Sequence, residues 1–413
     1  MPKTKFLSAL SCTAMIALSM SASAAFAQDT AITRVTAPLP SQAIQELRRN
    51  FNDASINALT FHEMDSIFET LPVEAGEHPS PLERTDKTPD FTYEYNGQTH
   101  AFEDIFERTF TNALLIMKDG QLVFERYRNY TGPQTRFLSM SMAKSITSLL
   151  VGTAIEDGDI SSIDDEIVTY VPELRGTAYD GVTVRDALLM KTGVGQEDNY
   201  QPAPDSEMAR LREESMILNR VPSLRQAHLV ERADEPGRTF RYLTLNTAVL
   251  GEVVAQATGK PMPDYMSERL WQPLGAQADG FWLADGVPGI GKAMNGMGFN
   301  AVARDYARLG QMMLDQGMAN GQQIVSPEWI EASTVPIGPE PASANYDQGY
   351  QYQWWTLTDS NAYMAIGLQG QFIYVDPDTN TVVVKLSYFP LGPQEPYRES
   401  EAFFRAASNW LAE

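Results

Sequence analysis

The sequence is poor in the side chains that most often carry thiol or metal chemistry. Its 413 residues include a single cysteine, Cys12, so an intramolecular disulfide and a cysteine metal site are both excluded. The four histidines, His62, His78, His100 and His228, show no H-E-x-x-H or other metal-binding spacing. The serine motif G-x-S-x-G does not occur in the sequence. The sequence therefore favours neither a zinc enzyme nor an α/β-hydrolase triad, and it implies no metal and no other cofactor.

Positive charge is also scarce. The chain has 31 Lys and Arg against 53 Asp and Glu, which gives a formal net charge of −22 at pH 7. Such an acidic surface repels nucleic acid and anionic lipid. We therefore expect a small-molecule partner and no nucleic acid.

The one long apolar run is at the N-terminus. Two lysines precede a mostly apolar stretch from Phe6 to Ala25, and Ala25-Phe26-Ala27 has the A-x-A form of a cleavage site. We expect residues 1–27 to be a signal peptide that is cleaved near Ala27, which leaves no stable membrane anchor. The mature protein would then be secreted or periplasmic, and it would lose Cys12.

Strand patterns occur in two distant parts of the chain. Residues 113–117 and 122–127 are apolar or alternating and flank the turn Asp119-Gly120, which predicts a hairpin. Residues 352–356, 371–375 and 381–387 have strand patterns near the C-terminus. We expect one antiparallel sheet formed by residues 91–160 together with residues 292–413.

Helical patterns cover much of the remaining chain. They are found at residues 43–51, 142–155, 246–257, 301–316 and 401–411. Residues 28–90 predict an N-terminal extension, and residues 161–291, with short helical patches joined by Pro, Gly and Asp loops, predict an inserted lobe that is mostly helical. The predicted fold class is α/β (α+β), an antiparallel sheet flanked by helices, with a cleft beside the inserted lobe.

The sequence S-M-A-K at residues 141–144 is the first candidate for catalysis. Ser141 and Lys144 are three residues apart at the start of the predicted helix 142–155, so their side chains face the same way. The helix N-terminus favours a developing negative charge, and a desolvated lysine can be neutral and accept the serine proton. The alternative is an N-cap serine beside a solvated lysine, but the apolar helix around Lys144 favours catalysis.

Three longer stretches carry a family resemblance. They are F-L-S-M-S-M-A-K-S at 137–145, V-T-V-R-D-A-L-L-M-K-T-G at 182–193 and R-D-Y-A-R-L-G at 304–310. Together they resemble the serine β-lactamase-like (class C β-lactamase-related) hydrolases, in the branch similar to 6-aminohexanoate-dimer hydrolase and related carboxylesterases. The resemblance implies a β-lactamase/transpeptidase-like fold and a serine hydrolase that cleaves small esters or amides, with Ser141 as nucleophile and Lys144 as base.

The second motif of this family is a tyrosine two residues before a polar side chain, commonly Y-x-N. Here the matching segment is Tyr242-Leu243-Thr244. The resemblance implies that Tyr242 passes the proton between the nucleophile and the leaving group. Thr244 stands where Asn is usual, as Ser does in some nylon-oligomer hydrolases, and its role is left open.

The third family motif is a strand that reads K-T-G or H-x-G, and two registers are open in the segment A-I-G-L-Q-G-Q at residues 365–371. In the first register the motif glycine is Gly367, and Ala365 takes the cationic position. The backbone N–H of Leu368 would then join that of Ser141 in the oxyanion hole.

In the second register the motif glycine is Gly370. Leu368 then takes the cationic position, and the oxyanion hole uses the N–H of Gln371. A hydrocarbon stands at the cationic position in both cases and cannot pair with the carboxylate of a β-lactam. We therefore expect poor β-lactam turnover.

A polar loop at residues 195–200 lies between the first and second motifs. In the nylon-oligomer hydrolases a loop tyrosine closes on the substrate, so Tyr200 is a candidate lid residue, and an exposed loop aromatic is the alternative. Two other functions stay open. One is a non-catalytic exported binding protein for peptide or cell-wall fragments, and the other is a weak β-lactamase or D-peptidase.

Overall fold

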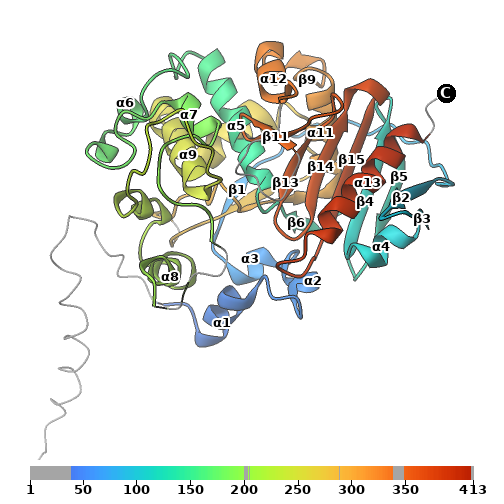
Figure 1. Ribbon diagram of the computed structural model, residues 1–413, viewed down its shortest axis with the longest axis horizontal. Coiled ribbons are helices and arrows are strands. Elements are labelled where there is room, and N and C mark those ends of the chain that lie inside the picture. The colour runs from blue at the N-terminus through green and yellow to red at the C-terminus, as the bar shows by residue number, and fades with distance from the viewer. Residues whose placement is uncertain (1–38, 200–202, 204, 288, 338–347, 411–413) are drawn as a thin grey trace, which may run out of the picture. The chain divides into compact units, whose positions relative to one another are not determined.

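The computed structural model describes residues 39–199, 203, 205–287, 289–337 and 348–410 (Figure 1). The predicted signal peptide, residues 1–27, and the candidate lid residue Tyr200 lie outside this part of the chain. The helices are α1 (Gln42–Asn50), α2 (Asn57–Thr60), α3 (Met64–Ile67), α4 (Asp104–Arg108), α5 (Met142–Glu156), α6 (Ile167–Tyr170), α7 (Val184–Leu188), α8 (Glu207–Arg212), α9 (Thr244–Thr258), α10 (Met262–Met266), α11 (Ala303–Leu314), α12 (Pro327–Thr334) and α13 (Glu395–Asn409). The strands are β1 (Thr70–Val73), β2 (Thr92–Tyr95), β3 (Gln98–Ala101), β4 (Thr111–Lys118), β5 (Gln121–Tyr127), β6 (Arg136–Leu138), β7 (Gly280–Leu283), β8 (Phe299–Val302), β9 (Met318–Ala319), β10 (Gln322–Gln323), β11 (Gln348–Gln351), β12 (Trp354–Leu357), β13 (Tyr363–Gly367), β14 (Gln371–Asp376) and β15 (Thr381–Ser387).

The main sheet has seven antiparallel strands in the order β11-β12-β13-β14-β15-β4-β5. The β4–β5 hairpin turns at Asp119 and Gly120, which both have positive φ, as a tight hairpin turn requires. β15 pairs with β4 from Thr381 opposite Lys118 onward, so strands from two distant parts of the chain join in one sheet. This confirms the predicted fold class, an antiparallel sheet flanked by helices.

Both faces of the sheet are covered. Successive side chains of a strand point to opposite faces, so Val382 and Val384 of β15 belong to one apolar cluster and Val383 to another. The first cluster includes residues of α5 and α11, and the second includes residues of α13. In Figure 1 α13 lies in front of the sheet and α11 behind it. Such double coverage explains the near-continuous apolar sequence of β14 and β15.

α5 is the central helix of the molecule. Every residue from Met142 to Ala154 is buried, and the helix packs against α9 on one side and against β13 and β14 on the other. α9 is in turn surrounded by α6, α7 and α10. The sheet and the helical layer therefore meet along α5, where the S-x-x-K sequence lies.

A second, four-stranded sheet has the order β1-β7-β8-β6. Its β7 comes from the range 161–291 that the sequence assigns to the helical lobe, and β1 comes from the predicted extension 28–90. Ala301 and Val302 end β8, so the helix predicted from residue 301 begins only at Ala303. β7 and β8 are buried along their whole length, which removes the period of two that would identify them in sequence.

Other element boundaries also differ from the predicted ones. The strand predicted at 352–356 begins at Trp354, because Tyr352 and Gln353 have φ of 35° and 70° and form a turn. The C-terminal helix begins at Glu395 and not at residue 401. Pro396 does not prevent this earlier start, because it lies in the first turn of the helix, where proline is tolerated.

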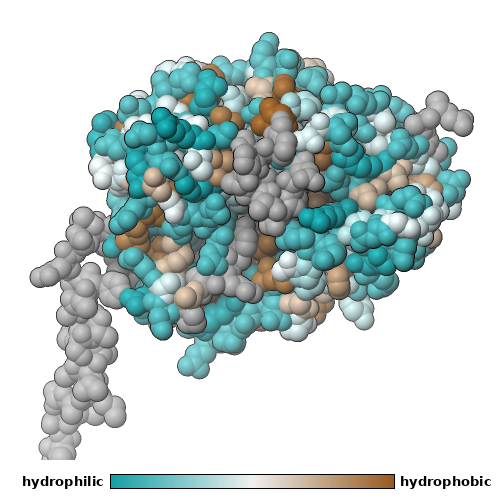
Figure 2. Space-filling model, viewed as in Figure 1, coloured by the Kyte–Doolittle hydropathy of each residue, from teal (hydrophilic) through white to brown (hydrophobic). Residues whose placement is uncertain are grey.

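The described surface is mainly polar. On the face shown in Figure 2 hydrophilic side chains predominate, and apolar ones occur in small groups. Within the described ranges, no helix combines the length and the apolar character that a membrane crossing requires.

Candidate active site

Ser141 lies where β6 leads into α5. The preceding residue, Met140, has φ of 45°, a left-handed conformation that is costly for a side chain of this size. Ser141 occupies the N-cap position of α5, but its hydroxyl makes no capping hydrogen bond. The structure therefore does not use this serine as a helix cap, and the hydroxyl interacts with Lys144 instead.

Lys144 is 1% exposed and has three oxygen partners for its three N–H bonds. Its Nζ donates to Ser141 Oγ at 2.9 Å and to Thr244 Oγ1 at 2.8 Å. The third bond, at 2.9 Å, goes to the carbonyl oxygen of Gly296. A Cβ on Gly296 would lie 2.6 Å from Thr244 Cγ2, so only glycine lets this carbonyl approach so closely. Lys144 is thus held against the serine hydroxyl.

Burial also changes the acidity of this lysine. It lowers the pKa of Lys144 to about 8, and the negative charge of Asp198 acts in the opposite direction. At pH 8 a lysine with that pKa is about half neutral, whereas an ordinary lysine with a pKa of about 10.4 is less than about 1% neutral. Lys144 can therefore act as a base near neutral pH.

Thr244 connects Lys144 to Asp198. Thr244 Oγ1 accepts from Lys144 and donates to Asp198 Oδ2 at 2.5 Å, while the backbone N–H of Thr244 donates to Asp198 Oδ1 at 2.8 Å. Thr244 is the first residue of α9, so the carboxylate also occupies a helix N-terminus, where negative charge is favoured. The role left open for Thr244 is therefore structural and electrostatic: it places the hydroxyl between base and carboxylate.

Tyr242 packs beside Lys144 from the strand-like segment before α9. The Nζ of Lys144 lies 4.9 Å from the centre of the Tyr242 ring. Two aromatic rings pack against the Tyr242 ring. The ring of Trp355 is stacked on it at 5.6 Å, and the ring of Tyr350 meets it edge-on at 5.9 Å, both measured between ring centres. The structure thus brings Tyr242 to the Ser141–Lys144 pair, as its place in the motif order predicts.

The end of β13 borders the nucleophile. A Cβ on Gly367 would lie 2.3 Å from the carbonyl oxygen of Ser139 and 3.0 Å from Met140 Cβ, so this glycine permits close approach of the two backbones. The next residue, Leu368, lines the same cavity as Ser141. Neither the N–H of Leu368 nor that of Ser141 bonds a backbone acceptor among the described residues. The two residues of the first register therefore line one cavity.

The residues of the second register lie elsewhere. Gly370 has φ of 92° in the turn after β13, and a Cβ there would lie 2.6 Å from the ring of Phe389. The side chain of Gln371 is buried in β14 and donates to the carbonyl oxygens of Gln369 and Ser387. Neither residue lines the cavity, because the turn carries the chain away from Ser141.

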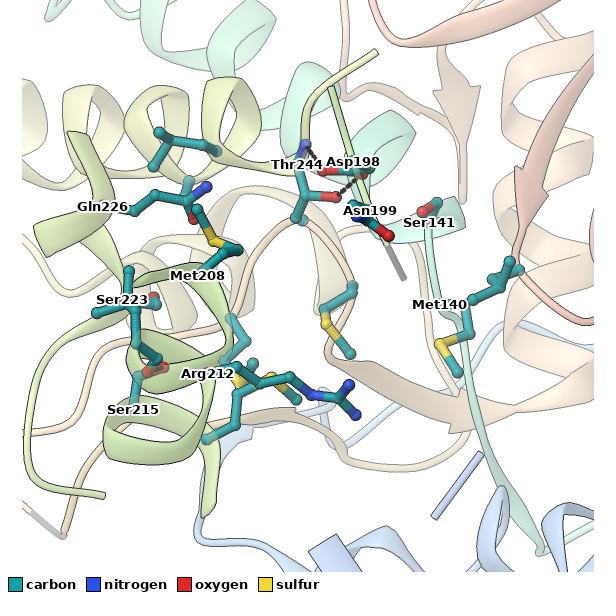
Figure 3. A pocket seen from close by; sticks show the side chains of 18 of the residues that line it. Met140, Ser141, Asp198, Asn199, Met208, Arg212, Ser215, Ser223, Gln226 and Thr244 are labelled. Carbon is teal, nitrogen blue, oxygen red and sulfur yellow. Dashed lines mark hydrogen bonds between the residues drawn. The ribbon is translucent and has the colours of Figure 1, made fainter. Parts of the chain in front are cut away.

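A cavity of about 220 Å³ opens in front of Ser141 (Figure 3). Much of its wall is apolar and rich in methionine, and two of the described lining side chains, Asp198 and Arg212, are ionic. Among the described residues, no three His, Cys, Asp or Glu side chains gather where they could hold a metal ion. The cavity suits a small organic molecule with a largely apolar body.

Three residues of the site carry no signal that identifies them in sequence. Asp198 stands in the loop 195–200 among other polar residues, and only its bonds to Thr244 distinguish it. Gly296 is one of 28 glycines, and its contact with Lys144 spans 152 residues. Arg212 lies in a segment with no recognised motif. Pairing between distant segments, which no local pattern records, brings all three to the site.

Comparison with known proteins finds relatives that share the sequence and the fold of this chain. The sequence model described as Beta-lactamase matches residues 103–402. The chain is 33% identical over 298 residues to the 6-aminohexanoate-dimer hydrolase of Paenarthrobacter ureafaciens, which covers 70% of this chain and 75% of that protein. It is 26% identical over 198 residues to Esterase EstB of Burkholderia gladioli, covering 43% of this chain and 49% of EstB. A solved structure of a Bacillus anthracis protein assigned as a 6-aminohexanoate-dimer hydrolase superposes with a TM-score of 0.79 at 24% identity, covering 90% of this chain and 98% of that one.

Proposed function

This chain belongs to the beta-lactamase family of serine hydrolases, and from that premise we propose that it cleaves small esters or amides through an acyl-enzyme on Ser141. The observation that carries the proposal is the 2.9 Å contact between Ser141 Oγ and the Nζ of a buried lysine. The pKa of that lysine, about 8, allows it to take the serine proton near neutral pH. No other serine in the described cavity has such a partner.

Acylation follows from this geometry. Neutral Lys144 accepts the hydroxyl proton, and Ser141 Oγ forms a bond to the carbonyl carbon of the substrate. The carbonyl oxygen becomes negative and lies between the N–H groups of Ser141 and Leu368. The position of Ser141 at the N-terminus of α5 adds a favourable helix dipole.

Tyr242 completes the proton path. The proton held by Lys144 passes by way of the Tyr242 hydroxyl to the leaving alcohol or amine as the bond to the carbonyl carbon breaks. In the second half-reaction neutral Lys144 accepts a proton from water as the water oxygen bonds to the acyl carbon, and that proton passes to Ser141 Oγ as the bond between Oγ and the acyl carbon breaks. Thr244 and Gly296 hold Lys144 in place through both half-reactions.

Both esters and amides are within the proposal. The relatives above are named as a 6-aminohexanoate-dimer hydrolase and as an esterase. The Ala365 side chain, buried in β13, offers no cation at the position where β-lactamase relatives carry one. We therefore place β-lactams outside the preferred substrates.

We also propose that residues 1–27 direct export. The support is the sequence pattern: two lysines, the apolar stretch from Phe6 and the A-x-A site ending at Ala27. Expression of the full chain in a bacterial host, followed by mass spectrometry of the exported fraction, should give a mature N-terminus at Gln28. Intact Met1 in a protein retained in the cytoplasm would contradict export.

The decisive experiment is covalent labelling of the serine. A fluorophosphonate probe should modify Ser141, and p-nitrophenyl acetate should be hydrolysed by the wild-type protein but not by Ser141→Ala. Ser145, one helical position beyond Lys144, donates its hydroxyl to the carbonyl of Gln353 and serves as the control, so Ser145→Ala should still be labelled. Undiminished hydrolysis by Ser141→Ala would refute the mechanism, and a wild-type protein that no probe labels would favour a binding protein.

A further inference from the structure

Arg212 is a cation in the wall of the active-site cavity, where the described neighbours are apolar or neutral polar side chains. It is the last residue of α8, and a π-helical turn, Glu213–Ile217, follows it directly. Such turns often occur at functional sites because the extra residue redirects side chains. In Figure 3 the Arg212 side chain reaches into the cavity and points toward the side on which Met140 and Ser141 lie.

Arg212 has no hydrogen bond or ion pair with any residue that the structure describes, although the chain is strongly acidic. Its neighbours are engaged elsewhere: Glu213 pairs with Arg49 at 2.6 Å, and Glu214 lies 3.8 Å from Arg220. Burial lowers the pKa of Arg212, and the charge of Glu213 acts in the opposite direction without outweighing it, which reflects the cost of removing this cation from water. An anion that binds beside it would recover that cost.

Among the described lining residues one other side chain is ionic, and it is bonded to Thr244 and not paired with Arg212. Asp198 accepts hydrogen bonds on both carboxylate oxygens from Thr244. The wall near Arg212 includes the apolar side chains of Met208, Met216 and Leu211. It also includes Gln226 and two serines, Ser215 and Ser223, whose hydroxyls donate to the carbonyl oxygen of Leu211 and to Asp285 Oδ2. A ligand in this part of the cavity therefore meets hydrocarbon, neutral polar groups and, among the described side chains, one cation.

The cavity lies on the acyl side of the scissile bond. Ser141 and Leu368, which would hold the carbonyl group, line it, but Tyr242 is not among the described lining residues. Tyr242 is the group proposed to protonate the leaving alcohol or amine, so the leaving group extends toward Tyr242 and the acyl chain enters the cavity.

We propose that Arg212 binds a carboxylate at the far end of the acyl chain, so that the preferred substrates are esters or amides of short dicarboxylic acids. This inference rests on the proposed acyl-enzyme at Ser141. The apolar wall contacts the methylene chain, the guanidinium group pairs with the terminal carboxylate, and Ser141 attacks the carbonyl at the other end. The planar, always-charged guanidinium matches a carboxylate with two parallel hydrogen bonds.

Three ethyl esters with similar chains test the proposal. Monoethyl adipate ends in a carboxylate, ethyl 5-carbamoylpentanoate in a neutral amide of the same shape, and ethyl 6-aminohexanoate in an ammonium group. Wild-type kcat/KM should favour the carboxylate over the carboxamide by about 10- to 100-fold, the effect of a hydrogen-bonded ion pair in a partly buried site. Arg212→Met should bring that ratio close to 1, because hydrolysis of the carboxylate ester loses the ion pair while the carboxamide ester has none to lose.

Two further variants control for charge and folding. Arg212→Lys keeps the charge but not the paired geometry and should retain part of the preference. Arg210, on the same helix, is exposed and bonds the carbonyl of Asp205, so Arg210→Met should leave the ratio unchanged.

Several outcomes would overturn the proposal. They are an equal wild-type rate on the carboxylate and carboxamide esters, a preference for the ammonium ester, or an Arg212→Met variant that loses activity equally on all three. Carboxymethyl butyrate carries its carboxylate on the alcohol, so an Arg212→Met effect confined to this ester would place the subsite on the leaving-group side. If Ser141→Ala still hydrolyses the three ethyl esters, the acyl-enzyme itself is refuted, whichever end group is preferred.

Discussion

Replacement of Asp198 by Asn should move the pH dependence of Ser141 reactivity toward acid. In the wild-type protein Ser141 reacts when Lys144 is neutral, so reactivity should rise with pH through a midpoint near the Lys144 pKa of about 8. The negative charge of Asp198 raises that pKa because it stabilises the ammonium form. Asn has nearly the same shape without the charge, so the neutral form of Lys144 should appear at lower pH.

The structure sets the size of the effect. Nζ of Lys144 and Oδ2 of Asp198 are joined through Thr244 by bonds of 2.8 and 2.5 Å, so they are no more than about 5 Å apart. Unit charges at about 5 Å interact by about 3 kcal/mol at an effective dielectric constant of about 20. Since 1.36 kcal/mol corresponds to one pKa unit, the midpoint should fall by about 2 pH units.

The assay is the second-order rate constant of fluorophosphonate labelling between about pH 5 and pH 10. This measurement avoids leaving-group protonation and so isolates the Ser141–Lys144 pair. The limiting rate at high pH should be lower in Asp198→Asn, because a lysine of lower pKa is a weaker base. Glu197 is an exposed carboxylate in the same loop, and Glu197→Gln removes the same charge as a matched control.

The reasoning fails if the midpoint stays near pH 8 in Asp198→Asn, or if it rises. It also fails if Glu197→Gln moves the midpoint as far, because the effect would then come from the net charge of the loop. A wild-type midpoint near pH 10 would show that burial does not lower the Lys144 pKa.

Three further outcomes are expected from the same site. Lys144→Arg keeps a positive charge that it cannot lose, so ester hydrolysis should fall by about two orders of magnitude or more, the scale of general-base catalysis; near wild-type rates would contradict the assignment of the base. Tyr242→Phe removes the proton donor, so kcat/KM for an anilide should fall more than that for a p-nitrophenyl ester, whose leaving group needs little protonation, and an equal loss on both would exclude this role for Tyr242. Nitrocefin should be turned over far more slowly than p-nitrophenyl acetate, because Ala365 offers no cation to its carboxylate, and comparable kcat/KM values would show that another group binds it.

Local sequence was sufficient to predict a helix or strand where the residue pattern within the segment is that of the element. The helix expected at 142–155 is found at Met142–Glu156, and the strand expected at 381–387 is found at Thr381–Ser387. In both cases apolar or β-branched residues recur with the period of the element, or fill it entirely. The turn at Asp119-Gly120 was also predictable, since its two positive φ values suit these residue types.

The short strands of the second sheet were not predictable in this way. β6, β7 and β8 have three or four residues each and owe their existence to pairing with one another. A three-residue segment has too few positions to show a period, and burial on both faces removes the alternation that remains. The limits of the domains at residues 90, 160 and 291 stay predictions.

Some residues of the candidate site were predictable from local sequence, and others were found only in the tertiary structure. Ser141 and Lys144 are one helical turn apart, so local sequence alone determined that their side chains meet. The order of the motifs pointed to Tyr242, but the choice between Gly367 and Gly370 depended on which glycine meets the Ser139 backbone in space. The bond from Thr244 to Asp198 spans 46 residues, and that from Lys144 to Thr244 spans 100. Only the tertiary structure decided these contacts. A side chain reaches a few ångströms, so the chain must fold back on itself to bring residues so far apart in sequence within hydrogen-bond distance.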